Sequence, residues 1–119
     1  MFIGVCRLEL VLSGNRSLKG KRRVSRSLGD RARLRFRLSV AEVEALESLQ
    51  KLILGAAYVS NDPVHARQVL QRFVRWVEST ALGELRASQI DVLRPGLSEA
   101  PLVREEGDCD GATESSSGQ

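Results

Sequence analysis

The strongest constraint on the fold is the order in which two kinds of hydrophobic periodicity follow one another along the chain. Apolar residues alternate at every second position in some segments, as in β-strands, and recur every three or four positions in others, as in amphipathic helices. The resulting order is strand, helix, strand, strand, helix, strand. Each helix lies between two strands, so it connects strands of one sheet.

The expected element boundaries follow from the residues that flank these patterns. Ser17 and Asp62 are expected helix N-caps, because their side-chain oxygens accept free backbone N–H groups, and Pro63 suits the first helical position. Gly83 is expected to end the second helix. A helix over residues 40–52 competes with a strand that ends near residue 43, and we favour the strand. The expected strands are 2–12, 36–43, 52–60 (buried on both faces) and 86–93, and the expected helices are 18–35 and 63–80.

This order predicts an α+β fold of the ferredoxin-like type (βαββαβ), in which a four-stranded antiparallel sheet carries two helices on one face. The 119 residues fit one domain, and the 42% of hydrophobic residues supply an aliphatic core, because only 4% are aromatic. We expect residues 1–96 to form the domain. Residues 97–119 are acidic and rich in Ser and Gly, and we expect them to be disordered.

Several protein classes are disfavoured. The longest uncharged stretch, residues 52–61, is too short for a membrane span. Arg7 and Glu9 interrupt the apolar N-terminus, so we expect no signal peptide and a cytosolic protein. Cys6 and Cys109 share no metal-ligand spacing, and in a reducing compartment we interpret them as free thiols. No cofactor motif is apparent.

Charge is distributed unevenly along the chain. Residues 1–40 carry a formal charge of +9, residues 41–95 carry −1 and residues 96–119 carry −5. Such asymmetry points to an anionic partner for the first third. It also suggests that the acidic tail folds back onto the basic segment and competes with that partner.

One face of the first helix is the leading candidate for a binding site. At 100° per residue its cations gather opposite the apolar arc, with Asp30 as the only acid in the segment, whereas a merely solubilising face tends to mix signs. A row of cations suits a phosphate backbone, and Arg can donate two hydrogen bonds to one phosphate. The expected RNA-binding residues are Arg16 in the preceding loop and Lys19, Arg22, Arg23, Arg26 and Arg33 on the helix.

Two short blocks carry a resemblance to a known family. The block Arg16-Ser17-Leu18-Lys19-Gly20-Lys21-Arg22-Arg23 and the block Ser60-Asn61-Asp62, at this spacing, resemble the YlxP-like family of small bacterial proteins of unknown function. The resemblance covers about residues 2–94 and implies a ferredoxin-like fold. The family's genes commonly lie beside those of initiation factor 2 and ribosome-binding factor A, which implies a connection with RNA or the ribosome.

Other motifs favour plainer interpretations. The order of residues after Gly14 does not match a phosphate-binding P-loop, although an anion could still bind at the start of the first helix. We interpret Lys21 as a side chain that extends outward from under the helix, and His65 as an ordinary exposed imidazole. Glu42 and Glu44 are expected on one solvated strand face rather than as an acid–base pair.

The sheet face without helices offers few aromatic side chains for base stacking, since only Phe2 and Tyr58 are suitably placed. RNA is therefore expected to contact phosphates rather than stack on the sheet. An exposed apolar patch usually marks an interface, so this face is a candidate for pairing with a second copy. The residues expected in the patch are Ile3, Val5, Ile53, Ala57 and Val59.

These observations together predict a non-enzymatic protein that binds RNA or the small ribosomal subunit through its first helix. Two alternatives stay open. One is an anion- or small-molecule-binding homo-oligomer with its site at the sheet interface, and the other is a protein–protein interaction module.

Overall fold

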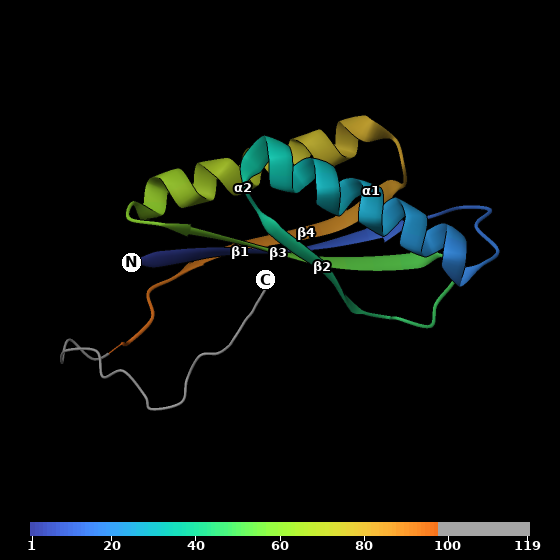
Figure 1. Cartoon of the computed structure of the whole chain (residues 1–119), viewed down its shortest axis with the longest axis horizontal. Helices are drawn as coiled ribbons and strands as arrows, with labels where there is room; N and C mark the ends of the chain where they lie inside the picture. The colour runs from blue at the N-terminus through green and yellow to red at the C-terminus, as the bar shows by residue number, and fades with distance from the viewer. Residues whose placement is uncertain (98–119) are drawn as a thin grey trace, which may run out of the picture.

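The computed structural model describes residues 1–97. In chain order the elements are β1 (Phe2–Val11), α1 (Leu18–Phe36), β2 (Ser39–Glu44), β3 (Lys51–Ser60), α2 (Pro63–Thr80) and β4 (Glu84–Leu93). The strands form one antiparallel sheet in the order β2-β3-β1-β4, and both helices cover the same face of it (Figure 1). The ferredoxin-like α+β prediction is confirmed. The expectation of disorder for 97–119 falls, apart from Leu97, outside the described residues.

The core lies between the sheet and the helices, and strict alternation in the central strand β1 builds one side of it. Cys6, Leu8 and Leu10 point toward the helices and are buried, whereas their neighbours on the other face are partly exposed. Leu28 of α1 and Phe73 of α2 meet this layer, and both are fully buried. Within residues 1–97, neither helix combines the length and apolar character needed to cross a membrane.

The first helix is one residue longer than expected. The Ser17 hydroxyl accepts a hydrogen bond from the Gly20 N–H at 2.9 Å, as an N-cap should. Phe36, expected to begin the second strand, is instead the last helical residue, and Arg37 follows in the left-handed conformation. The helical position of Phe36 is accompanied by packing on α2, because its ring lies 5.7 Å from that of Trp76.

Strand β3 is buried on both faces only in its first half. Leu52, Ile53 and Leu54 are each at most 2% exposed, but Val59 near the other end is 63% exposed. The expectation that the whole run is buried on both faces is therefore wrong. The helices cover only one face of the sheet, so the outward side chains beyond Leu54 lack the covering that a doubly buried strand requires.

The second helix begins at a side-chain cap, as the sequence predicts, but it does not end at the predicted glycine. The Asp62 carboxylate accepts a hydrogen bond from the Val64 N–H at 2.9 Å, as expected of an N-cap. The helix ends at Thr80, and Ala81, not Gly83, follows as its cap in the left-handed conformation. Gly83 serves a different purpose, since a Cβ there would lie 2.7 Å from Cδ2 of Leu12. It allows the start of β4 to approach β1 closely.

Candidate nucleic-acid interface

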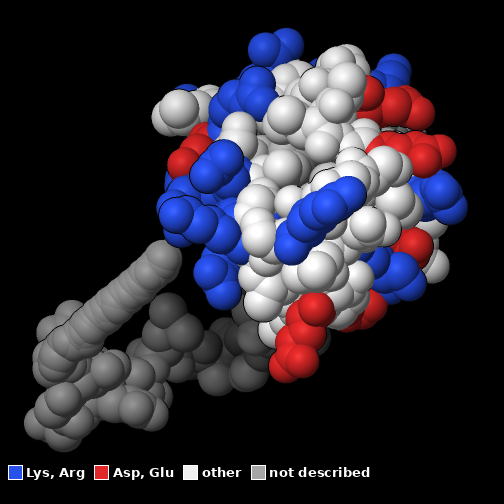
Figure 2. Space-filling view, turned by 90° about the vertical axis from the view of Figure 1, so that its right-hand side faces the viewer, with Lys and Arg blue, Asp and Glu red and all other residues white. Residues whose placement is uncertain are grey.

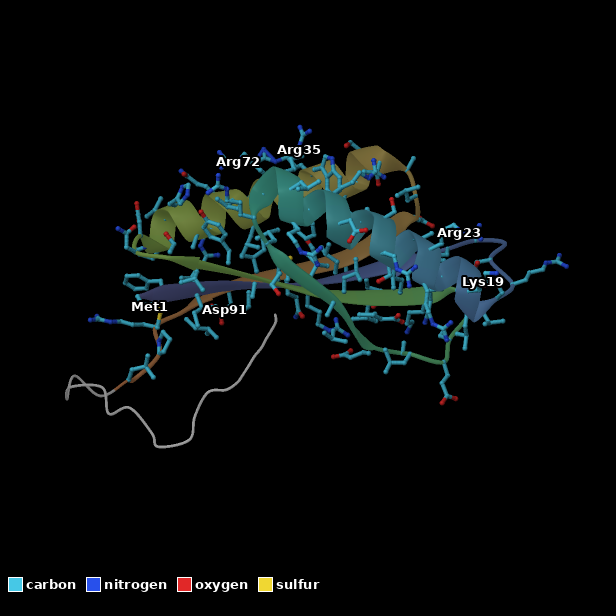
Figure 3. All side chains as sticks on the ribbon, in the orientation of Figure 1. Met1, Lys19, Arg23, Arg35, Arg72 and Asp91 are labelled. Carbon is cyan, nitrogen blue, oxygen red and sulfur yellow. The ribbon has the colours of Figure 1, made fainter. Side chains whose placement is uncertain are left out.

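The face of α1 that points away from the sheet carries the predicted cluster of cations. Lys19, Arg22, Arg23 and Arg26 are all exposed and line a shallow depression on the helix surface, together with Ser27 and Asp30. Lys19 and Arg23 extend from the first half of α1 (Figure 3). This half begins at the Ser17 cap, and its cations recur at three- and four-residue steps, which place them on one side of a helix. The sequence prediction of a shared face is correct for these four.

The ion pairs of this surface distinguish two groups of predicted residues. Arg33 lies 3.3 Å from the Asp30 carboxylate, so one acid offsets its charge. Among the described residues, Lys19, Arg22, Arg23 and Arg26 have no carboxylate within 4.0 Å. Arg16 is exposed in the loop that precedes α1. The first half of the helix therefore presents its charges without internal compensation.

Lys21 belongs to the same sequence block but not to this surface. Its side chain is 1% exposed, and its ammonium lies 2.7 Å from a Glu42 carboxylate oxygen. It also donates hydrogen bonds to the carbonyls of Ala45, at 2.8 Å, and Leu46, at 3.3 Å. The expectation of an outward-extending lysine is wrong. Lys21 instead fixes the β2–β3 connection to the start of α1.

Glu42 and Glu44 do not share a strand face, contrary to expectation. The pairing of β2 with β3 shifts register between them, so the alternation is broken at this point. Glu42 pairs with Lys21 on the helix side, whereas Glu44 accepts a hydrogen bond from Arg7 at 2.5 Å on the open side. That hydrogen bond lowers the pKa of Glu44 and raises the pKa of Arg7. Both carboxylates are engaged with cations.

The positive surface extends beyond α1, which sequence analysis did not anticipate. Ten Lys and Arg side chains of the two helices are exposed, against the two acids Asp30 and Glu78. Arg35 and Arg72 both project from the helical layer on the side away from the sheet (Figure 3). Figure 2 views the end where α1 begins, and Lys and Arg side chains crowd one side of it. The signal was present in the sequence, because the fold prediction already placed both helices on one face. The residues missed are Arg31, Arg35, Arg67, Arg72 and Arg75.

The opposite, open face of the sheet divides into an apolar and a charged half. In the apolar half, Ile3 pairs across the sheet with Val59, and Val5 pairs with Ala57. Ile53 is not part of this patch, because it is 2% exposed and pairs in register with Glu9 and Glu44 of the charged half. Its inclusion among the exposed apolar residues was wrong.

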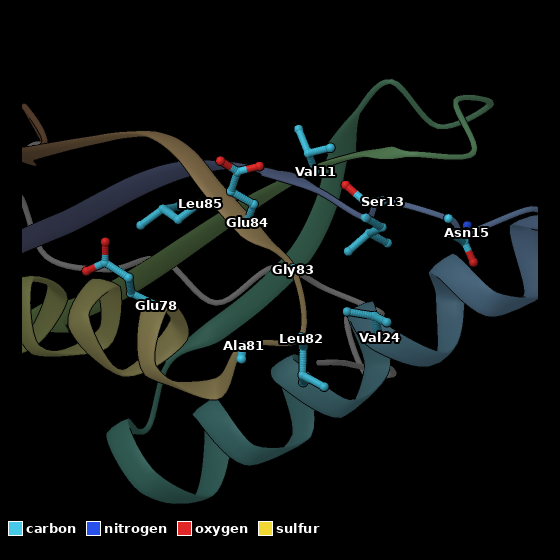
Figure 4. A pocket seen from close by; sticks show the side chains of 12 residues that line it. Val11, Ser13, Asn15, Val24, Glu78, Ala81, Leu82, Gly83, Glu84 and Leu85 are labelled. Carbon is cyan, nitrogen blue, oxygen red and sulfur yellow. The ribbon is translucent and has the colours of Figure 1, made fainter.

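A groove of about 800 Å³ lies at the end of the sheet, between the β1–α1 loop, α1 and the α2–β4 connection (Figure 4). Apolar side chains such as Val24 and Leu82 line it, and Glu78 and Glu84 are its charged residues. The negative charge of these two glutamates would repel an anion.

Tyr58 and His65 form a pair elsewhere in the molecule, with the Tyr58 hydroxyl 3.1 Å from Nε2 of His65. Residues 1–97 contain no group of three or more His, Cys, Asp or Glu side chains placed to hold a metal ion.

Comparisons with known proteins place the chain in a family. The uncharacterised protein YlxP of Bacillus subtilis (strain 168) is 30% identical over 77 residues, which cover 65% of this chain and 84% of that protein. Among solved structures, a mutant of SnoaB, a cofactor-independent oxygenase from Streptomyces nogalater, is 10% identical and covers 84% of this chain and 98% of that chain. Its TM-score is 0.36, and a match this loose carries no argument. The model of the family described as "Protein of unknown function (DUF503)" matches residues 3–90, and the chain therefore belongs to the DUF503 family, together with YlxP-like proteins.

Proposed function

We propose that this protein binds RNA, either free or on the surface of the small ribosomal subunit, through the outer face of α1. The observation that carries the proposal is the group formed by Lys19, Arg22, Arg23 and Arg26, which is exposed and has no carboxylate partner among residues 1–97. Uncompensated cations in a row match the repeating charge of a phosphate backbone. In this proposal the protein acts by binding in the cytosol and is not an enzyme.

Charge reversal on α1 tests the proposal. The variant Arg22→Glu/Arg23→Glu/Arg26→Glu should no longer sediment with purified 30S subunits or bind RNA, while its circular dichroism spectrum stays that of the wild type. A matched control, Lys51→Glu/Arg86→Glu/Arg94→Glu, changes the net charge equally but alters exposed cations outside the helical layer. If the α1 variant binds as the control does, the proposal is wrong.

Salt dependence supplies a second test on the unmodified protein. Each phosphate contact releases condensed counterions, so the logarithm of affinity should fall linearly with the logarithm of salt concentration. The four cations of the α1 group by themselves predict a slope of about −3 to −4, and each further phosphate contact would steepen it by nearly one. A slope near zero would show that α1 does not bind through phosphates.

We also propose that the apolar half of the open sheet face pairs with a second copy of the chain. Val59 is 63% exposed and Leu93 is 46% exposed, and both pair in register with Ile3. Exposed apolar side chains gathered in this way are typical of an interface. The helical layer remains free in such a dimer, so this pairing and RNA binding are compatible. The same face would serve a different protein if the chain were an interaction module, and an analysis of its oligomeric state separates the two cases.

A further inference from the structure

The positions of the aromatic side chains restrict the kind of RNA that the helical layer can bind. All five aromatic residues of the chain lie within the described part, and none of them is exposed. Phe36, Phe73 and Trp76 pack together between the helices. The Tyr58 ring lies against that of His65, and the Arg94 guanidinium lies over the Phe2 ring. Proteins that hold single strands usually stack bases on exposed aromatic rings, whereas here each Phe, Tyr and Trp ring is buried or only partly exposed, and the exposed His65 lies against Tyr58.

The exposed cations of the helical layer form two sets, on helices that pack against one another. The first set is the α1 group described above. The second lies where the helices meet, and in it the Arg31 guanidinium is 5.5 Å from the centre of the Trp76 ring. The Trp76 ring also packs edge-on against the Phe36 ring, with centroids 5.7 Å apart, so an aromatic contact joins the end of α1 to α2. To this second set we assign three further exposed arginines, which are Arg35 near the end of α1 and Arg72 and Arg75 on α2.

The reach of these two sets suits an extended polyanion of high charge density. Along the axis of α1, Lys19 and Arg35 are about 24 Å apart, at 1.5 Å per residue, and they project from different sides of the helix, about 160° apart around its axis. A duplex carries about twice the charge per unit length of a single strand, and its phosphates hold fixed positions. The helical backbone fixes where these side chains begin, so only the side chains themselves lose entropy when they meet the fixed phosphates of a duplex. A flexible single strand would have to be ordered along the same length, with no exposed Phe, Tyr or Trp ring to offset that cost.

We propose that the RNA bound by this protein is double-stranded, and that the arginines of α2 and of the C-terminal half of α1 contact its phosphates together with the α1 group. The inference rests on the proposed function and specifies its partner. Recognition is then by shape and charge, since the helical layer presents arginines and no aromatic platform for reading unstacked bases.

Fluorescence anisotropy with a short RNA duplex and with each of its separated, unstructured strands tests the inference. We expect the duplex to bind at least about tenfold more tightly than either strand, because it places more phosphates within reach of the cations. If both forms bind equally well, the inference is wrong while the proposed function stands. If neither form binds, the inference is wrong, and if the protein also fails to sediment with 30S subunits, the proposed function fails as well.

A second variant tests the contribution of the arginines where the helices meet. Arg35→Gln/Arg72→Gln/Arg75→Gln should reduce the slope of log affinity for the duplex against log salt by about three, nearly one for each lost phosphate contact. Arg72→Gln/Arg75→Gln alone, which leaves α1 untouched, should reduce it by about two. The control Lys51→Gln/Arg86→Gln/Arg94→Gln should leave the slope unchanged. A wild-type slope in either arginine variant would overturn the inference.

Discussion

The ammonium of Lys21 lies 2.7 Å from a carboxylate oxygen of Glu42, and this pair joins the first turn of α1 to β2 beneath the helix. The Lys21 side chain is 1% exposed and that of Glu42 is 15% exposed. A third backbone carbonyl, that of Lys51, lies 3.4 Å from the same ammonium. Lys21 is thus buried in a contact that joins two elements of the fold, while Arg22 and Arg23 of the same basic sequence block are exposed to solvent.

Replacement of Lys21 should destabilise the protein strongly. Lys21→Met leaves the Glu42 carboxylate without its partner and several carbonyls without a donor, and we expect a loss of about 3–5 kcal/mol in the free energy of unfolding. Urea denaturation measures this change. Lys51→Met is the control, because Lys51 is exposed and lies 3.9 Å from Glu9, and it should cost at most about 1 kcal/mol. Similar losses in the two variants would contradict the assigned role of Lys21.

Gly29 in the middle of α1 offers a stabilising substitution. A Cβ at this position would meet Cβ of Val40 at 3.9 Å, an ordinary van der Waals distance. Gly29→Ala should therefore raise the free energy of unfolding by about 1 kcal/mol through helix propensity alone, with a higher Tm. Gly4→Ala should have the opposite effect, because its Cβ would lie 2.7 Å from Cδ1 of Leu70. A lower Tm for Gly29→Ala would show that α1 packs more tightly on β2 than this distance indicates.

Cys6 should react slowly with alkylating agents. Burial raises the pKa of its thiol from 9.0 to about 11, because desolvation disfavours the thiolate. In a Cys109→Ser background, the rate of iodoacetamide labelling should rise toward half of its maximum near pH 11 in the folded protein. In guanidinium chloride the same midpoint should lie near pH 9. Coincident midpoints in the two conditions would show that the thiol is not buried in solution.

The raised pKa of the Cys6 thiol also predicts how the free energy of unfolding depends on pH. Between pH 9 and 11 the unfolded chain releases a proton that the folded chain retains, so stability should fall as pH rises through this window. Below pH 9 both states hold the proton, and the thiol contributes no pH dependence there. Cys6→Ala should abolish this part of the alkaline loss, which comparison of urea midpoints across the window would reveal.

The proposed homodimer predicts a specific effect of charge on the open sheet face. Val59→Asp should shift the protein toward the monomer in sedimentation equilibrium, because a carboxylate within an apolar interface loses its hydration. Val64→Asp is a closely matched control, since Val64 on α2 is 62% exposed and Val59 is 63% exposed. A wild-type protein that is monomeric at every concentration tested would refute the dimer.

Removal of the acidic tail tests whether it competes with RNA. Residues 96–119 carry a net charge of −5, and residues 1–40 carry +9. Deletion of residues 97–119 should tighten RNA binding at low salt, and the difference should disappear at high salt, where screening weakens attraction between the two segments. Unchanged affinity at low salt would remove the idea that the tail competes.

Local sequence signals predicted most of the fold because they act through the backbone. The caps at Ser17 and Asp62 and the alternation of β1 depend on hydrogen bonds and periodicities that a chain segment specifies by itself. The cations of the first half of α1 were placed correctly for the same reason, since helical spacing alone groups them. The errors fall where distant segments meet, as at Phe36, which is helical and packs against Trp76 of α2, and at Lys21, which is buried against Glu42.

The sequence by itself determined the order of the elements, the sheet face that is buried, and the excess of positive charge at the start of the chain. Only the tertiary structure decided which of these charges are free to bind a partner. It buried Lys21 against Glu42 and placed the arginines of α2 in the same layer as those of α1. The pair of Arg33 with Asp30 is different, because the two residues are three apart on one helix and helical spacing alone brings them together. The physical reason is that the charge of a side chain is a property of its residue, whereas burial and pairing depend on what the fold places beside it.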